Sequence, residues 1–304
     1  MIELNNITKT YPKEGVTALH DVSLSVKQGE LFGLIGPDGA GKTTLFRILT
    51  TLLLADKGEA KVNNFDVIND YRQIRNCVGY MPGKFSLYQD LTVEENLNFF
   101  ATIFGTTIQQ NYDLVKDIYQ QIEPFKDRLA GKLSGGMKQK LGLCCALIHK
   151  PDVLFLDEPT TGVDVVSRRE FWEMLGKLKR QGITILVSTP YMDEANLCDR
   201  IALIQKGKLL SIDTPVNIIK SFPDKLYALQ SFAIFKLLKD TQNYPGTASC
   251  FAFGEVLHVT FNDAADKGAV AYLKDKGHTD VHMELIDPTI EDCFIRFLAH
   301  DEHD

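Results

Sequence analysis

Short runs of apolar residues recur along the first 220 residues of the chain and predict a series of buried strands. Several runs are continuous, as in parallel sheets that are covered on both faces. They comprise residues 2–8, 23–26, 31–35, 78–81, 153–157, 184–188 and 201–205. After the third run, apolar residues recur at helical spacing, at Leu45, Ile48, Leu49 and Leu52. This alternation of strands and helices predicts an α/β domain with a mainly parallel sheet over residues 1–220.

Residues 90–150 interrupt the alternation with helical patterns. Thr92 and Glu95 have the spacing of a capping box, in which a threonine N-cap is followed three residues later by a glutamate. Helical spacing continues through residues 112–122 and 137–148. We therefore expect a helical subdomain at about residues 90–150, inserted into the α/β domain.

The pattern changes after residues 221–224, which contain Pro223 and predict a domain boundary. Beyond it, residues 226–229, 248–253, 256–261 and 281–285 are predicted strands. Residues 232–239, 264–276 and 289–298 are predicted helices. The order strand, helix, strand, strand, helix, strand, then a last helix, predicts a small α+β domain of the split β-α-β type over residues 225–304.

A glycine-rich loop joins the third strand to its helix and fits the phosphate-binding pattern G-x-x-x-x-G-K-[ST]. Its residues are Gly36, Pro37, Asp38, Gly39, Ala40, Gly41, Lys42, Thr43 and Thr44. Glycines permit positive φ and let phosphate oxygens approach backbone N–H groups at a helix N-terminus. Lys42 can reach the β- and γ-phosphates, and Thr43 offers a hydroxyl to Mg²⁺. The loop therefore predicts a nucleotide-phosphate site.

Two carboxylates, Asp157 and Glu158, stand at the end of the apolar strand 153–157. Ligands bind at the carboxyl edge of an open α/β sheet. Asp157 is placed to hold Mg²⁺ through a water molecule, so Thr43 and Asp157 are the candidate metal ligands. Glu158 is placed to orient or deprotonate the water that attacks the γ-phosphate, which makes it the candidate catalytic residue.

A second motif of small residues, Ser134, Gly135 and Gly136, lies between Leu133 and Met137 at the start of a helical pattern. A serine N-cap with glycines and free N–H groups forms an anion site. Its position before the strand of Asp157 makes it the most discriminating feature of the chain.

Residues 1 to about 220 resemble the ATP-binding subunits of ABC transporters, on several motifs that occur in the family's order. Residues 36–44 match the Walker A loop, and residues 153–158 match Walker B with the catalytic glutamate. Residues 133–137 match the signature motif, with Met137 in place of its glutamine. Residues 161–164, ending at Asp164, match the D-loop, and Tyr11 lies where the family places an aromatic ring that stacks on adenine.

The resemblance implies a P-loop NTPase fold with an antiparallel β-subdomain beside the main sheet, and it implies ATP and Mg²⁺ as the bound groups. In the family two such domains pair head to tail, and each ATP lies between one Walker A loop and the other domain's signature. The resemblance therefore implies that Ser134, Gly135 and Gly136 contact an ATP held by the partner, with Asp164 beside it.

Two positions depart from the family pattern. Gly83 stands where the Gln-loop ends in glutamine, and Pro190 stands where the switch loop has histidine. A proline offers neither a side-chain donor nor an N–H to a γ-phosphate. We expect slow hydrolysis at the chain's own Walker site, with its signature serving the site of a second ABC subunit. A heterodimer is favoured, and a homodimer stays open as the alternative.

The segments at residues 85–97 and 191–195 resemble the drug and polysaccharide exporter branch of the family, and residues 287–294 resemble that branch's accessory C-terminal domain. The resemblance implies an ABC-2 type transmembrane permease as the partner. It also implies a cytoplasmic location, peripheral on the inner face of the cell membrane.

Composition narrows the remaining classes of protein to which the chain could belong. The 304 residues carry a formal net charge of −7, which leaves no electrostatic footprint for nucleic acid, and no apolar run approaches the length of a membrane span. The first residues lack the basic start and apolar stretch of a signal peptide, and the six scattered cysteines indicate neither a zinc site nor a disulfide framework. The alternative class is a soluble ABC ATPase that acts on ribosomes or DNA without a permease.

Overall fold

The computed structural model of the chain describes residues 1–262 and 265–301. It divides into two compact units, Met1–Pro215 and Val216–Asp304, each of which is described by itself. The division falls at the start of helix α7 (Pro215–Lys220), whereas the sequence pattern places the boundary after it. Contacts explain the difference, because the Cys293 thiol donates to the Ile218 carbonyl and ties α7 to the second unit.

The first unit contains ten strands and six α-helices among its residues. The strands are β1 (Ile2–Tyr11), β2 (Val16–Val26), β3 (Leu31–Ile35), β4 (Lys57–Val62), β5 (Phe65–Asp66), β6 (Val78–Met81), β7 (Val153–Asp157), β8 (Thr184–Thr189), β9 (Arg200–Gln205) and β10 (Lys208–Asp213). The α-helices are α1 (Lys42–Leu49), α2 (Tyr71–Cys77), α3 (Val93–Ile103), α4 (Tyr112–Tyr119), α5 (Gly135–Leu147) and α6 (Val165–Arg180). Short 3₁₀ turns occur at Glu123–Phe125, Ala130–Lys132 and Met192–Leu197.

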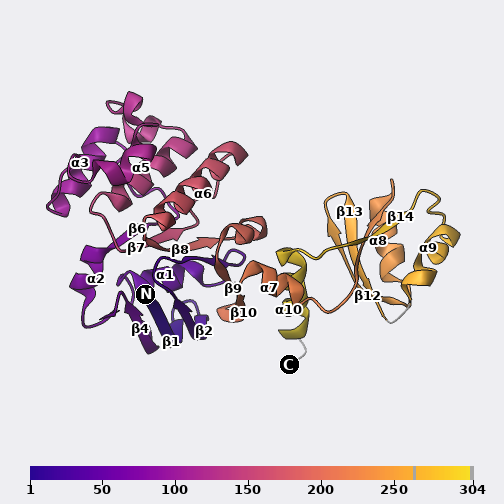
Figure 1. The fold of residues 1–304 in the computed structure, drawn as a ribbon. Helices are drawn as coiled ribbons and strands as arrows, with labels where there is room; N and C mark the ends of the chain where they lie inside the picture. The colour runs from indigo at the N-terminus through magenta and orange to yellow at the C-terminus, as the bar shows by residue number, and fades with distance from the viewer. Residues whose placement is uncertain (263–264, 302–304) are drawn as a thin grey trace. The chain divides into compact units, whose positions relative to one another are not determined.

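Two sheets enclose helix α1 in this unit (Figure 1). One is a six-stranded sheet of order β10-β9-β3-β8-β7-β6, parallel except for β10, and the other is an antiparallel sheet of order β2-β1-β4-β5. Every residue of β3, β7 and β8 is buried, as expected of central parallel strands. The rings of Phe46 on α1 and Phe155 on β7 meet edge to face, with centroids 6.0 Å apart. The predicted P-loop fold with an antiparallel β-subdomain is confirmed.

The register of the parallel sheet gathers several loops at one edge. Asp157 pairs with Ser188 on the neighbouring strand, and Ile35 pairs with Thr189. The segments that leave β3, β7 and β8 therefore emerge side by side, and β6 delivers the segment at Gly83 next to β7.

The helical segment follows β6, and α5 contacts α3, α4 and β6. Helix α3 starts with the predicted capping box: Glu95 N donates to Thr92 Oγ1 over 3.1 Å, and Thr92 N donates to Glu95 Oε2 over 2.8 Å. Helix α4 ends at Tyr119, three residues before the predicted end, and the chain turns toward Pro124. Proline lacks an N–H and cannot continue a helix, which explains the early end.

The sequence pattern misses β4, β5, α2 and β10, and it shortens β1 and β2. These elements lack a continuous apolar run. In β4, for example, only Ala60 and Val62 are buried, between lysine and glutamate residues that face solvent. A short, half-buried strand of this kind leaves a weak signal in the sequence.

The second unit contains β11 (Leu226–Gln230), α8 (Ile234–Gln242), β12 (Thr247–Phe253), β13 (Val256–Phe261), α9 (Asp266–Asp275), β14 (His282–Ile286) and α10 (Ile290–Asp301). Its antiparallel sheet has the order β12-β13-β11-β14, and both α8 and α9 contribute to one core with Leu237 and Leu273. The predicted order of strands and helices is confirmed. Helix α8 starts two residues later than predicted, because Phe232 N is bound to Asp280 Oδ2 over 2.6 Å. The predicted helix start at Ala264 and residues 302–304 lie outside the described residues.

No helix within residues 1–262 and 265–301 combines the length and apolar character that crossing a bilayer requires.

Candidate functional site

The loop between β3 and α1 has the backbone that its glycines predict. Gly39 and Gly41 adopt φ of 78° and 105°, and a Cβ on Gly41 would lie 2.4 Å from the Ala18 carbonyl oxygen. Helix α1 then starts with no side-chain cap and no acidic residue in its first turn. Its first N–H groups therefore have no intrahelical acceptor and face an anion-binding position.

Lys42 lies buried at the centre of this loop, with 2 % of its side chain exposed. Its ammonium donates to the carbonyl oxygens of Gly36, over 2.7 Å, and Pro37, over 3.0 Å. The third partner is Glu158, whose Oε1 lies 2.9 Å from Lys42 Nζ. The structure thus joins the Walker A lysine directly to the predicted catalytic carboxylate.

Ser188 on β8 binds both the Asp157 side chain and the Glu158 backbone. Its hydroxyl donates to Asp157 Oδ1 over 2.7 Å, and Glu158 N donates to its carbonyl oxygen over 3.1 Å. Glu158 adopts φ of 50°, which directs the chain away from β7 immediately after the buried Asp157. Burial and, second, the charge of Asp157 raise the pKa of the neighbouring Tyr80 hydroxyl to about 12. Asp157 and Glu158 are therefore fixed by the sheet itself.

Three further predicted residues line the loop. Tyr11, the last residue of β1, places its hydroxyl 3.3 Å from Thr44 Oγ1. Thr43 is partly exposed in the first turn of α1. Among the described residues there is no cluster of three or more histidine, cysteine or acidic side chains that would hold a metal by itself. Thr43 and Asp157 would hold Mg²⁺ only together with phosphate oxygens and water, which is the usual arrangement for this ion.

The two departures from the family pattern flank the same site. A Cβ on Gly83 would lie 2.9 Å from the Asp157 carbonyl oxygen, so a side chain there requires the segment to shift. Pro190 directly follows Thr189, whose carbonyl oxygen accepts the Gly36 N–H over 3.2 Å. The switch segment is thus bound to the glycine loop through its backbone.

The signature residues form a second cluster with the D-loop. Ser134 caps α5 by accepting the Met137 N–H over 3.4 Å, and a Cβ on Gly136 would lie 2.7 Å from Ser167 Oγ. Asp164 caps α6 by accepting the N–H groups of Ser167, over 3.0 Å, and Val166, over 3.1 Å. The hydrogen bond from Ser167 is the main cause that lowers the pKa of Asp164.

Gly135 also belongs to this cluster, because a Cβ there would lie 3.6 Å from the Gly162 carbonyl oxygen. In the described chain no hydrogen bond or ion pair connects Ser134 or Gly136 with Lys42 or Glu158. The structure therefore assembles two half-sites, one around Lys42 and one at the starts of α5 and α6.

Sequence reasoning missed the buried side chains behind the Lys42 half-site. Thr160, Thr189 and Glu194 are each at most 2 % exposed, and the hydroxyls of both threonines donate to the Glu194 carboxylate. The only signal available was the presence of polar residues beside apolar strands. His149 lies just beyond the end of α5. Its Nε2 is 3.0 Å from the Val78 carbonyl oxygen, and its ring stacks on Phe104. Burial lowers the pKa of this imidazole, which favours its neutral form.

A cavity of about 700 Å³ adjoins the segment at Gly83, between β6 and helices α3 and α5. Its lining is largely apolar and includes Met81, Pro82, Phe85, Phe100 and Phe104.

Comparison with known proteins gives consistent matches. The family model for the ABC transporter matches residues 19–161. The Nod factor export ATP-binding protein I of Burkholderia orbicola is 41 % identical over 223 residues, 72 % of this chain and 73 % of that protein. The probable multidrug ABC transporter ATP-binding protein YbhF of Escherichia coli is 38 % identical over 98 % of this chain and 52 % of that protein. The chain thus spans about half the length of YbhF.

Solved structures also match the first part of the chain. The ATP-binding cassette MJ0796, in a dimeric post-hydrolysis state bound to ADP and Pi, superimposes with a TM-score of 0.64 at 26 % identity. The match covers 70 % of this chain and 98 % of that one.

Proposed function

The chain belongs to the ABC transporter family, and on that premise we propose that it is the ATP-binding subunit of an exporter, which couples ATP binding and hydrolysis to a membrane permease. The observation that carries the proposal is the meeting of Lys42 and Glu158 at 2.9 Å, because a phosphate-binding lysine and a candidate base share one position. A reaction at a bound phosphate uses both groups.

Each residue of the Lys42 half-site has a proposed role. The N–H groups of residues 36–44 and the Lys42 ammonium bind the phosphates, and the Tyr11 ring stacks on adenine. Thr43 and Asp157 would hold Mg²⁺, which would neutralise charge on the phosphates. Glu158 moves from Lys42 when phosphates take its place, and its carboxylate then accepts a proton from the attacking water.

The second half-site acts on a partner's nucleotide. Ser134, Gly135 and Gly136 present the hydroxyl and N–H groups of the α5 terminus, with Asp164 beside them. Two subunits paired head to tail complete both sites, and the similarity to the dimeric MJ0796 cassette supports this pairing. Gly83 and Pro190 favour an unlike partner, whose own site is the faster one and uses this chain's signature.

The permease is the proposed membrane partner. The names of the relatives support an exporter, since they describe multidrug transport and Nod factor export. We assign permease docking to the apolar cavity beside Gly83, because the segment that lines it continues directly into the Lys42 half-site. The chain is then peripheral on the cytoplasmic face of the membrane, residues 1–220 act as the ATP-binding domain, and residues 225–304 as an accessory domain.

The test is ATP binding by the purified chain, measured by calorimetry with Mg·ATP. Lys42→Ala removes a buried full charge from the phosphates, so we expect ATP affinity to fall at least about tenfold. Lys61→Ala, at an exposed position of β4, is the matched control and retains the wild-type affinity. Equal affinity of the wild type and Lys42→Ala would refute the assignment.

A further inference from the structure

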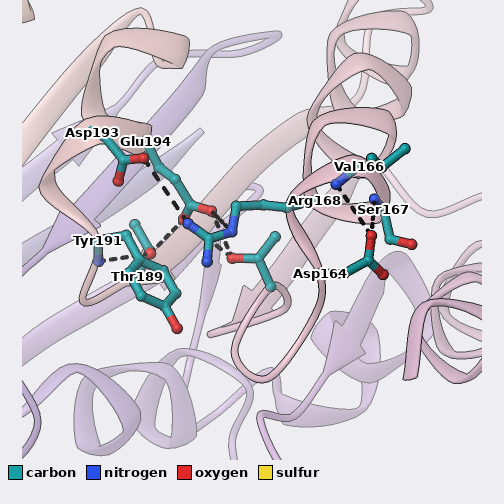
Figure 2. Close-up of polar contacts among 9 residues, drawn as sticks. Asp164, Val166, Ser167, Arg168, Thr189, Tyr191, Asp193 and Glu194 are labelled. Carbon is teal, nitrogen blue, oxygen red and sulfur yellow. Dashed lines mark hydrogen bonds and ion pairs between the residues drawn. The ribbon is translucent and has the colours of Figure 1, made fainter. Parts of the chain in front are cut away.

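A buried carboxylate joins the segments that follow β7 and β8. Glu194 lies in the 3₁₀ turn after β8 and is 2 % exposed (Figure 2). It accepts the Thr160 hydroxyl at both of its oxygens, over 2.8 and 3.1 Å, and the Thr189 hydroxyl over 2.5 Å. Both threonines are themselves almost fully buried. Two buried hydroxyls donating to one buried carboxylate are more than an ordinary surface turn requires.

Helix α6 supplies the opposing charge. The Arg168 guanidinium lies over the Tyr191 ring at 4.1 Å from its centroid, and its Nε is 3.6 Å from Glu194 Oε1. This distance is too long for a hydrogen bond, and Arg168 Nε is a buried donor without a hydrogen-bond partner among the described residues. Figure 2 shows Arg168 at the start of the same helix as Asp164 and Ser167. Through Arg168, the Glu194 carboxylate is therefore also linked to the end of the D-loop at Asp164.

The two threonines lie next to the groups that would react. Thr160 is two residues beyond Glu158, and the Thr161 N–H donates to the Glu158 carbonyl oxygen over 3.2 Å. Thr189 follows Ser188, which binds Asp157, and its own carbonyl oxygen accepts the Gly36 N–H. Glu194 therefore connects the catalytic segment, through Thr160, with the end of β8, through Thr189.

We propose that Glu194 is a positioning residue for hydrolysis, which holds the segments of Glu158 and Thr189 in fixed register across β7 and β8. The proposal rests on the proposed ATPase function. Pro190 gives it particular weight, because the switch segment lacks a donating side chain at that position and is fixed instead by the Thr189 hydroxyl. Binding of ATP at the glycine loop does not require this register, whereas proton transfer to Glu158 does.

The experiment separates the rate of hydrolysis from the affinity for ATP in the purified full chain. Single-turnover hydrolysis of Mg·ATP gives the rate, and calorimetry gives the affinity. We expect Glu194→Gln to lower the rate about tenfold and to change ATP affinity by less than about twofold. Thr160→Val removes one hydroxyl at nearly constant volume and should lower the rate about fivefold, while Thr160→Ser, which keeps the hydroxyl, restores it to within about twofold of the wild type.

Two controls address a purely structural role. Asp193→Asn changes the adjacent acid, which is exposed and lies 3.9 Å from Arg168, and it keeps the wild-type rate. Thr184→Val removes a buried hydroxyl from the opposite end of β8, where it accepts the Gly29 N–H, and it lowers thermal stability without a change in rate. Combining Glu194→Gln with Thr160→Val should lower the rate by less than the product of the two single effects, since both act on one contact.

The outcomes distinguish the two proposals. If the wild-type chain fails to bind ATP, the ATPase function is wrong and the role of Glu194 falls with it. If the wild type hydrolyses ATP and Glu194→Gln keeps the full rate, only the positioning role is overturned. If Glu194→Gln does not fold, the Thr160→Val and Thr160→Ser pair decides, and equal rates for those two overturn the role.

Discussion

At the scale of single residues, Gly83 and Pro190 differ in how closely the rest of the protein packs around them. Gly83 is packed against the Asp157 carbonyl oxygen, with 2.9 Å available for a Cβ. Pro190 is partly exposed and lies beyond the end of β8. The backbone is therefore packed closely around the glycine, whereas the proline is in part open to solvent.

Pro190→His is expected to raise the rate of ATP hydrolysis by the purified chain about tenfold, because it restores one donor to the developing charge. Gly83→Gln is expected to lower the free energy of unfolding by about 1–3 kcal/mol, because its Cβ must displace the Asp157 segment. Steady-state ATPase assays and urea denaturation measure the two effects.

Gly176→Gln on α6 is the control for the added bulk, since the atom nearest to a Cβ there is 3.8 Å away, and it should not destabilise the protein. A wild-type rate in Pro190→His, or full stability in Gly83→Gln, contradicts this view of the two positions.

At the scale of elements, α6 depends on Asp164 as its N-cap. Two backbone N–H groups bind one carboxylate oxygen, and the Ser167 N–H is the first cause that lowers the pKa of Asp164 below its ordinary 3.8. A carboxyl whose pKa is lower in the folded protein stabilises the fold above pH 3.8, and this contribution is lost as the pH falls through the lowered value.

We expect the first turn of α6 to lose protection from hydrogen exchange as the pH falls below 3.8. Asp164→Asn retains an uncharged cap and removes that pH dependence, whereas Asp164→Ala weakens the turn at every pH. Exchange rates that follow the same pH profile in the wild type and in Asp164→Asn would show that the charge has no part in capping.

Local patterns were sufficient for the elements that carry the motifs. The apolar runs predicted the bounds of β3, β6, β7 and β13, because buried central strands are continuous in sequence. The same reasoning failed at β4, where only two side chains are buried. It also failed at Glu194, since its partners Thr160 and Thr189 come together only when β7 and β8 lie near each other in one sheet. A hydrogen bond between buried polar side chains leaves no periodic pattern in a single sequence.

At the scale of the whole molecule, the two half-sites are separate surfaces of the first unit. Under the proposed function and pairing, the Lys42 half-site binds the nucleotide of this chain and the Ser134 half-site contacts that of a partner. In the assembled transporter, a substitution in the Lys42 half-site should therefore affect hydrolysis of this chain's nucleotide, whereas a substitution in the Ser134 half-site should affect hydrolysis of the partner's nucleotide.

We expect Ser134→Arg to abolish most ATPase activity of the assembled complex, because it places bulk and charge where the partner's ATP must bind. Glu158→Gln in this chain should reduce activity less, since it disables the slower site. The measurement is steady-state ATPase of the complex with each single substitution. If Glu158→Gln lowers the ATPase activity more than Ser134→Arg does, most of the hydrolysis takes place at this chain's own site, and the asymmetric pairing is wrong.

The contacts of Lys42 set what a ligand must offer in order to bind. The ammonium already has one carboxylate and two carbonyl oxygens within 3.0 Å, in a position closed to water. A ligand displaces Glu158 only by bringing at least as much negative charge to the same point. Adenosine cannot do so, although Tyr11 would meet its base as well as that of ATP. Discrimination among adenine compounds at this site therefore follows the length of the phosphate chain, and the nucleoside itself is a poor competitor.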